Sequence, residues 1–109
     1  NTFVGDRDDP GHKAELPLTT LDKIAAGLGL PRVDFIKMNI EGAERQAVAG
    51  AAGVIRRYKP RMALCVYHLP DDPVVIPREV LALRGDYSRA CGSCLFAAGR
   101  ISPQVFFFR

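Results

Sequence analysis

The stretch that decides the predicted fold is Val33-Asp34-Phe35-Ile36-Lys37-Met38-Asn39-Ile40-Glu41-Gly42-Ala43-Glu44. Residues 33–40 are mostly apolar or β-branched and predict a strand. Beyond Gly42, small and apolar residues recur every three or four positions, which predicts one long helix over 42–58 that ends before Pro60. A strand followed directly by a helix is the repeating unit of α/β sheets.

The segments on either side continue this alternation of strands and helices. Before the stretch, 16–19 is short and extended, and Thr19 or Thr20 caps a helix that closes at Gly29. After it, the apolar run 61–67 predicts a strand covered on both faces, as in a parallel sheet. The next helix opens at Asp72-Pro73 or at Ile76-Pro77.

The two ends of the chain depart from this alternation. Residues 87–96 and 104–108 predict an antiparallel pair of extended segments, with Gly99 and Pro103 in the turn between them. Phe106-Phe107-Phe108 reads as the final strand, with at least one ring pointing outward. Turn-forming residues are concentrated at positions 6–12, so the segment 1–15 is predicted to be a loop. The sequence therefore predicts an α/β core over 16–109 preceded by a loop.

Composition narrows the possible functions. The 109 residues, 48% of them hydrophobic, suffice for one core. The net charge of +3 is small, and the one basic cluster, over 56–61, falls where a helix ends, so nucleic acid is not the expected partner. No apolar run approaches the roughly 20 residues that span a bilayer, so no membrane partner is expected. Three cysteines, an odd number, suggest reduced thiols in the cytoplasm.

The Cys91-Gly92-Ser93-Cys94 stretch is a C-x-x-C motif in an unusual place. In a thioredoxin-like site this motif opens a helix, whereas here it lies in an extended region. A zinc site would need a second pair of ligands. We therefore expect buried or half-buried ordinary thiols, with thiol-redox or metal-binding function as a weaker alternative.

Polar side chains follow the two central predicted strands. Asn39 and Glu41 come at the carboxyl end of the first strand, and Tyr67 and His68 at the carboxyl end of the second. Ligands of open α/β sheets bind outside the carboxyl ends of the strands, so all four side chains are expected at one rim. Two structural roles compete with a site. Glu41 could serve only to cap the helix that follows, and His68 could serve only to satisfy loop backbone groups.

The same residues resemble the signature of the FkbM family of S-adenosylmethionine-dependent methyltransferases. In that signature, valine-aspartate-phenylalanine-isoleucine-lysine is followed by glutamate-glycine-alanine-glutamate, as in 33–44 here. Thr20-Leu21-Asp22, upstream, is similar to the family's threonine-leucine-aspartate. The matching segments downstream, in family order, are Lys59-Pro60-Arg61, Val66-Tyr67-His68, Pro70-Asp71-Asp72 and Ile76-Pro77. The resemblance covers roughly residues 16–87.

The resemblance implies a Rossmann-like class I methyltransferase fold with a seven-stranded sheet. Residues 1–109 would be a single partial domain, the C-terminal half of that fold, with a mostly parallel sheet that ends in an antiparallel strand pair. The implied cofactor is S-adenosylmethionine, and the implied reaction is methyl transfer to a hydroxyl of a small molecule or sugar.

The resemblance also gives roles to the rim residues. Methyl transfer to oxygen depends on positioning and benefits from a base. His68 is the preferred base because histidine titrates near neutrality, and Glu41 could orient it, bind the acceptor hydroxyl or act as the base. Asn39, Tyr67 and Glu44 are candidates for substrate or cofactor binding, although a first-turn Glu44 is more often a solvated charge. No metal ligand is expected.

The sequence departs from the family pattern in two ways. Asn39 stands where the family usually has aspartate, which keeps a carbonyl acceptor but loses the charge. The chain also lacks the glycine-rich turn and the acidic ribose-binding residue of the first strands, so alone it should bind S-adenosylmethionine weakly or not at all. The strand at 33–40 then becomes a sheet edge, which predicts a homodimer through that edge. The alternative function is a non-catalytic dimerisation or scaffold module derived from a methyltransferase.

Overall fold

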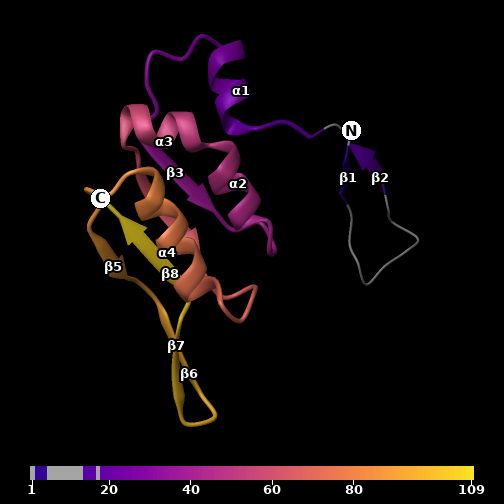
Figure 1. The fold of residues 1–109 in the computed structure, drawn as a ribbon. Helices are drawn as coiled ribbons and strands as arrows, with labels where there is room; N and C mark the ends of the chain where they lie inside the picture. The colour runs from indigo at the N-terminus through magenta and orange to yellow at the C-terminus, as the bar shows by residue number, and fades with distance from the viewer. Residues whose placement is uncertain (1, 5–13, 17) are drawn as a thin grey trace.

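A computed structural model of the chain describes residues 2–4, 14–16 and 18–109 (Figure 1). Its helices are α1 (Leu21–Gly27), α2 (Glu44–Gly50), α3 (Ala52–Tyr58) and α4 (Asp72–Leu83). Its strands are β1 (Thr2–Val4), β2 (Ala14–Leu16), β3 (Phe35–Met38), β4 (Arg61–Cys65), β5 (Arg89–Cys91), β6 (Cys94–Ala97), β7 (Arg100–Pro103) and β8 (Val105–Phe108).

The central sheet has four strands in the order β3-β4-β8-β5. β3 and β4 run parallel, with Met38 beside Leu64, whereas β8 runs antiparallel to both β4 and β5. The fold is therefore α/β with a mixed sheet, and the prediction of a mostly parallel sheet is wrong for the described residues. The cause is the tight turn after β6, which can only return the chain antiparallel, whereas a parallel neighbour needs a long crossover.

β5 to β8 form one long antiparallel ribbon. Cys91 pairs with Phe106, Cys94 with Pro103 and Ala97 with Arg100, so the pairing register continues unchanged along the ribbon. The two-residue turn at Ala98 and Gly99 has positive φ at both positions, 52° and 72°, as hairpin turns that match the strand twist require. The predicted antiparallel pair is thus confirmed, but Pro103 lies in β7 and not in the turn. The β6–β7 end of the ribbon extends away from the sheet (Figure 1).

All four helices contribute to one core on one face of the sheet. Val48, Ile55, Leu64, Ile76 and Val80 are completely buried. Burying each such side chain stabilises the fold by roughly 1.5–3 kcal/mol. The helix that the sequence placed at Asp72 or Ile76 begins at Asp72 and contains Pro77 in its interior.

The opposite face of the sheet is more open. Along β3, Ile36 and Met38 are buried, while Phe35 and Lys37 between them are exposed. In β8, Phe106 and Phe108 are buried and the Phe107 ring is 43% exposed, which confirms the prediction of an outward ring in the final strand. β3 also lies at the edge of the four-stranded sheet, as predicted.

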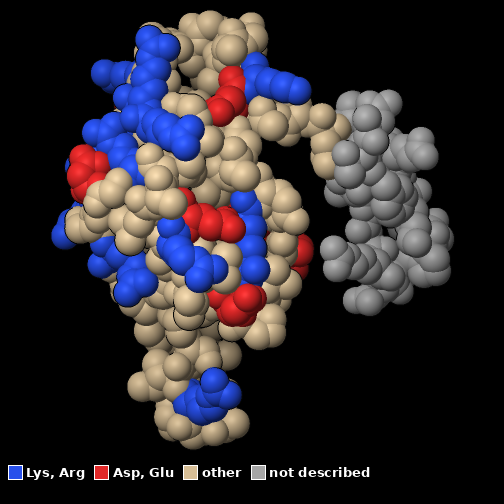
Figure 2. All heavy atoms as spheres, in the orientation of Figure 1, with Lys and Arg blue, Asp and Glu red and all other residues tan. Residues whose placement is uncertain are grey.

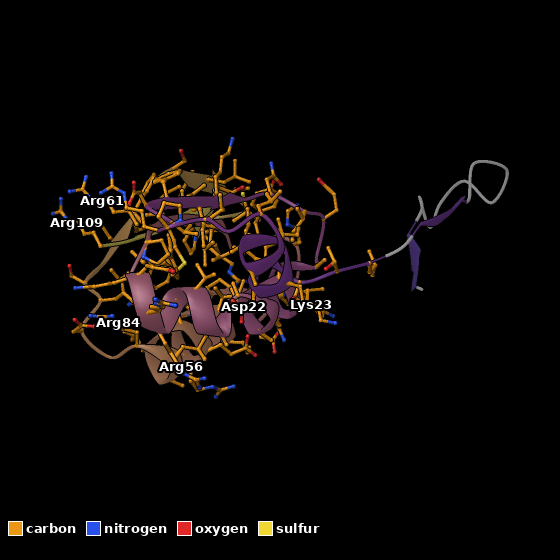
Figure 3. All side chains as sticks on the ribbon, turned by 90° about the horizontal axis from the view of Figure 1, so that it is seen from above. Asp22, Lys23, Arg56, Arg61, Arg84 and Arg109 are labelled. Carbon is orange, nitrogen blue, oxygen red and sulfur yellow. The ribbon has the colours of Figure 1, made fainter. Side chains whose placement is uncertain are left out.

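The single helix predicted over 42–58 is two helices that meet at Ala51. Asp22, on α1, accepts hydrogen bonds from the backbone N–H groups of Gly53 (2.8 Å) and Val54 (2.9 Å) (Figure 3). These amides lie in the first turn of α3. The N–H groups of a first helical turn have no carbonyl partner within the helix and need an acceptor from elsewhere. The break follows from this contact between residues about thirty positions apart, so local periodicity does not reveal it.

The amino-terminal prediction of a loop over 1–15 was wrong at both of its ends. β1 and β2 pair antiparallel, with Thr2 beside Leu16, and form a separate two-stranded sheet. The predicted turn over 6–12 lies outside the described residues.

Charged side chains follow the helix ends. Arg56 and Arg57 occupy the last turn of α3, and Arg84 donates a hydrogen bond of 2.7 Å to the carbonyl of Arg56 (Figure 3). This is the helix-end placement that the sequence predicted for the basic cluster. On the face drawn in Figure 2, acidic side chains lie among the basic ones. Within the described residues, no helix is long and apolar enough to cross a bilayer.

Candidate functional site

The carboxyl ends of β3 and β4 meet at one edge of the sheet. Because Met38 pairs with Leu64, the segment that follows β3 and the segment that follows β4 leave the sheet side by side. The structure brings Glu41 and Glu44 from the first segment together with His68 from the second. These three side chains form the carboxylate–imidazole cluster.

Glu44 is the buried anchor of this cluster. Its residue is only 1% exposed, and its carboxylate accepts hydrogen bonds from the N–H groups of Ile40 (2.9 Å) and Gly42 (3.1 Å). The turn that presents these amides has left-handed backbone at Glu41 (φ 58°) and Gly42 (φ 98°). The expectation of a solvated first-turn charge at Glu44 is therefore wrong, because the turn folds back over the carboxylate and needs it as an acceptor.

His68 lies between the two glutamates. Its Nδ1 is 2.9 Å from Glu44 Oε1, and its Nε2 is 3.5 Å from Glu41 Oε1. The side chain is 90% buried and both ring nitrogens are closed to solvent, yet neither N–H direction is aligned well enough for a hydrogen bond. The two carboxylates flank the ring on opposite nitrogens. A buried imidazole without an aligned partner is uncommon in a purely structural setting.

Glu41 is the accessible member of the cluster. Its side chain is 83% exposed, in contrast to His68 and Glu44. The sequence favoured His68 as the group that meets a substrate. The structure instead presents the Glu41 carboxylate to solvent, with His68 behind it.

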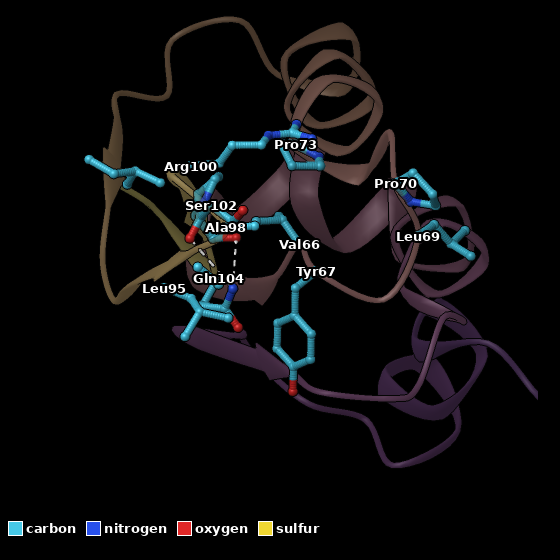
Figure 4. A pocket seen from close by; sticks show the side chains of 13 residues that line it. Val66, Tyr67, Leu69, Pro70, Pro73, Leu95, Ala98, Arg100, Ser102 and Gln104 are labelled. Carbon is cyan, nitrogen blue, oxygen red and sulfur yellow. Dashed lines mark hydrogen bonds between the residues drawn. The ribbon is translucent and has the colours of Figure 1, made fainter.

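Tyr67 connects the cluster to a cleft. Its ring centroid lies 4.3 Å from that of His68 at an interplanar angle of 38°, and the ring also lines a cleft of about 560 Å³ (Figure 4). One wall of the cleft is the segment 66–73, and the other is the β6–β7 hairpin with its adjoining Gln104. The polar groups of Arg100 and Gln104 share this lining with apolar side chains.

Asn39 shares the edge but not the cluster. It directly follows β3 and is exposed, and none of the described contacts joins it to Glu41 or His68. Its place at the rim agrees with the sequence expectation. Its role stays a prediction.

The sequence did not reveal the ion pair that fixes the second segment. Arg45 on α2 places its Nε 2.8 Å from Asp72 Oδ1, and Asp72 is only 1% exposed. The other Asp72 oxygen accepts the N–H of Leu69 at 3.0 Å. Arg45 also hydrogen bonds Asp71, which lowers the pKa of that carboxyl. This ion pair connects the segment after His68 to the helix that begins at Glu44. The one sequence signal for it was the position of Asp72 at a predicted helix start.

The described turns do not fit a cofactor by themselves. A nucleotide-like cofactor in an α/β fold usually rests on free backbone amides of a strand-to-helix turn. After β3 those amides bind Glu44, and after β4 the Leu69 amide binds Asp72. The described part of the chain also contains no group of three or more His, Cys, Asp or Glu side chains arranged to hold a metal ion.

An α/β domain with a mixed sheet, and with acid and imidazole side chains at the carboxyl edge, defines a broad class of ligand-binding domains and enzymes. Within it, the family model described as the methyltransferase FkbM domain matches residues 2–92. The chain thus belongs to the FkbM methyltransferase family.

One solved structure gives a measure of this likeness. It is the crystal structure of Methyltransferase FkbM from Methylobacillus flagellatus KT at 2.20 Å resolution, and the two chains are 31% identical with a TM-score of 0.56. The match covers 69% of this chain and 19% of that chain, so the similar part is a small portion of that protein. None of the curated proteins compared matches this chain.

Proposed function

We propose that this chain takes part in methyl transfer to a hydroxyl oxygen of a small molecule or sugar, with S-adenosylmethionine as the donor. The observation that carries the proposal is the Glu41–His68 pair, 3.5 Å apart, beside a cleft that Tyr67 links to it. Family membership supports the reaction class. The match to only part of a longer relative, together with the occupied backbone amides, indicates that other residues are needed to hold the donor.

The chemistry assigned to this chain concerns the acceptor. A hydroxyl oxygen that gains a methyl group must lose its proton, and a positioned base typically contributes a factor of 10²–10⁴ to such a step. Glu41 is exposed and takes the hydroxyl proton directly, and the buried His68 lies next to its carboxylate. Bound S-adenosylmethionine would supply an electrophilic methyl group.

The remaining rim residues position the acceptor. Tyr67 offers an aromatic wall in the cleft, and Asn39 offers an amide at the edge of the sheet. Glu44 is a positioning residue, because it is buried and holds both the turn that presents Glu41 and the ring of His68. An acceptor in the cleft would meet the hairpin residues Arg100 and Gln104 on its other side.

The test is methyl transfer from labelled S-adenosylmethionine to a panel of sugars and hydroxylated small molecules, measured on the natural protein that carries this chain. We expect Glu41→Gln and His68→Gln each to lower kcat by about 10²-fold or more. Asp34→Asn is the matched control, since Asp34 directly precedes β3 and its exposed side chain forms a surface ion pair with Arg32 (3.1 Å). Full activity in both site variants, or no transfer to any acceptor by the wild type, would refute the proposal.

The second candidate function is a non-catalytic homodimerisation module. It is supported by the edge position of β3 and by Phe35 on that strand, which is 58% exposed. Unpaired strand edges favour pairing with another chain. The dimer would form by β3 pairing across a two-fold axis.

Two measurements separate these candidates. In a calorimetric titration with S-adenosylmethionine, heat with one-to-one stoichiometry would exclude a pure scaffold. In sedimentation experiments, Phe35→Glu should weaken the dimer, while Leu28→Glu, at a 70% exposed position on another surface, should not. A wild-type protein that stays monomeric at high concentration would exclude the dimer.

A further inference from the structure

The C-x-x-C motif lies in the bend between β5 and β6. Cys91 and Cys94 are both exposed, and their Sγ atoms are 3.4 Å apart. The expectation of buried or half-buried thiols at these positions was wrong, whereas the third cysteine, Cys65, is buried in β4. The pair plays no part in the cluster at the carboxyl edge.

The short sulfur separation has a specific backbone cause. In a regular strand, residues three positions apart are about 10 Å apart and point to opposite faces. Here the chain bends at Gly92 and Ser93, and the partner strand holds the bend. The Gly92 N–H donates to Val105 (2.8 Å), and the Ser93 carbonyl accepts from Gln104 (2.8 Å).

Gly92 lets the ring of Phe107 lie against this bend. A Cβ atom at this position would overlap that ring, which is 43% exposed, so a larger residue would require the ring to move. The two hydrogen bonds to the partner strand flank the bend, and the two thiols face each other across it. A disulfide has an S–S distance of about 2.05 Å, so the two sulfurs need to approach by only about 1.4 Å more.

We propose that Cys91 and Cys94 are a redox site that reversibly forms an intrachain disulfide. The oxidant is a low-molecular-weight disulfide. The thiolate of one cysteine attacks a sulfur of that disulfide and releases one small thiol, and the second cysteine then attacks the mixed disulfide and releases the other. The two cysteines lose two electrons and two protons in total, and one disulfide is reduced to two thiols.

A metal site explains the pair less well. Soft metals such as zinc take four ligands, and the described residues place no third histidine, cysteine or acidic side chain with these two. The exposed position instead suits exchange with a dissolved disulfide. In the reducing compartment that the sequence predicts, the pair would be dithiol at rest and would respond to oxidation.

The proposed disulfide would join the end of β5 to the start of the β6–β7 hairpin. β5 is fixed in the sheet by β8, whereas β6 and β7 form the hairpin that walls the cleft beside Tyr67. Leu95, which directly follows Cys94, lines that cleft. The disulfide would clamp the base of the hairpin and restrict the motion of this wall. This proposal does not depend on methyl transfer.

The test is equilibration of the full chain with mixtures of oxidised and reduced glutathione, followed by alkylation and mass spectrometry. Mildly alkaline buffer is used, because the hydrogen bond with Cys94 raises the pKa of the Cys91 thiol and only the thiolate attacks. We expect the protein to lose two hydrogen atoms and the peptide that contains both cysteines to resist alkylation. Reduction should restore both thiols.

Three variants sharpen the result. Cys65→Ser should oxidise like the wild type, while Cys91→Ser and Cys94→Ser should each stop at a mixed disulfide with glutathione. Two alkylated thiols at 91 and 94 under oxidising conditions, or bonds that join Cys65 or two chains, would overturn the proposal. Hydrogen exchange provides the second readout: amides of β6 and β7 should exchange several-fold more slowly in the oxidised protein, and unchanged exchange would overturn the clamp.

Discussion

Replacing Glu44 with alanine should destabilise the protein through the turn that leads out of β3. The variant leaves the amides of Ile40 and Gly42 without their acceptor and removes the carboxylate next to His68. Hydrogen bonds to charged groups contribute about 1.5–3 kcal/mol each. Because both amides are only partly buried and water can replace part of the loss, we expect a total decrease of about 3 kcal/mol in the free energy of unfolding.

Glu44→Gln is the graded version of this change. It keeps one acceptor oxygen and so should lose about half as much, roughly 1.5 kcal/mol. Urea unfolding followed by far-ultraviolet circular dichroism measures both variants, and Gln46→Ala, at an exposed site on α2, should stay within about 0.5 kcal/mol of the wild type. If Glu44→Ala were as stable as this control, the carboxylate would not be what closes the turn.

Three further predictions concern other contacts. Asp22→Ala should lower the free energy of unfolding by about 1–2 kcal/mol, because the first turn of α3 loses its cap, and an unchanged urea midpoint would argue against that cap. Burial raises the pKa of Tyr87 to about 12, so its contribution to stability is complete below about pH 10 and is lost as the pH rises toward 12. Tyr87→Phe should remove the latest phenolate absorbance in an alkaline titration, and identical titrations would contradict this assignment. The hydrogen bond from Arg84 lowers the pKa of Asp86 to about 2, so its contribution is complete above about pH 4 and is lost as the pH falls through 2. Asp86→Asn should flatten the acid limb of stability, and an unchanged acid limb would refute this role.

Local pattern was enough to predict that Glu41 and His68 lie at one edge of the sheet. The apolar runs before Asn39 and Tyr67 predicted neighbouring strands, and parallel strands end at the same edge, so Glu41 and His68 were expected together. The structure places their side-chain atoms 3.5 Å apart. The antiparallel final strands were also predictable, because turn residues separated two extended segments.

What the sequence did not reveal depends on contacts between distant residues. The break at Ala51 requires Asp22, and the anchoring of the segment after His68 requires Arg45 and Asp72. The burial of Glu44 depends on a left-handed turn, which a glutamate–glycine pair permits but does not dictate. Hydrophobic periodicity carries no information on which distant polar group satisfies a given amide.

The left-handed backbone at Glu41 has a cost for folding. A residue with a Cβ in this conformation costs roughly 1 kcal/mol or more, whereas glycine adopts it freely. A protein optimised only for stability would therefore have glycine at position 41 as well as at position 42. The glutamate there keeps the turn strained, and if Glu41 has the proposed role, that strain accompanies a carboxylate needed for the reaction.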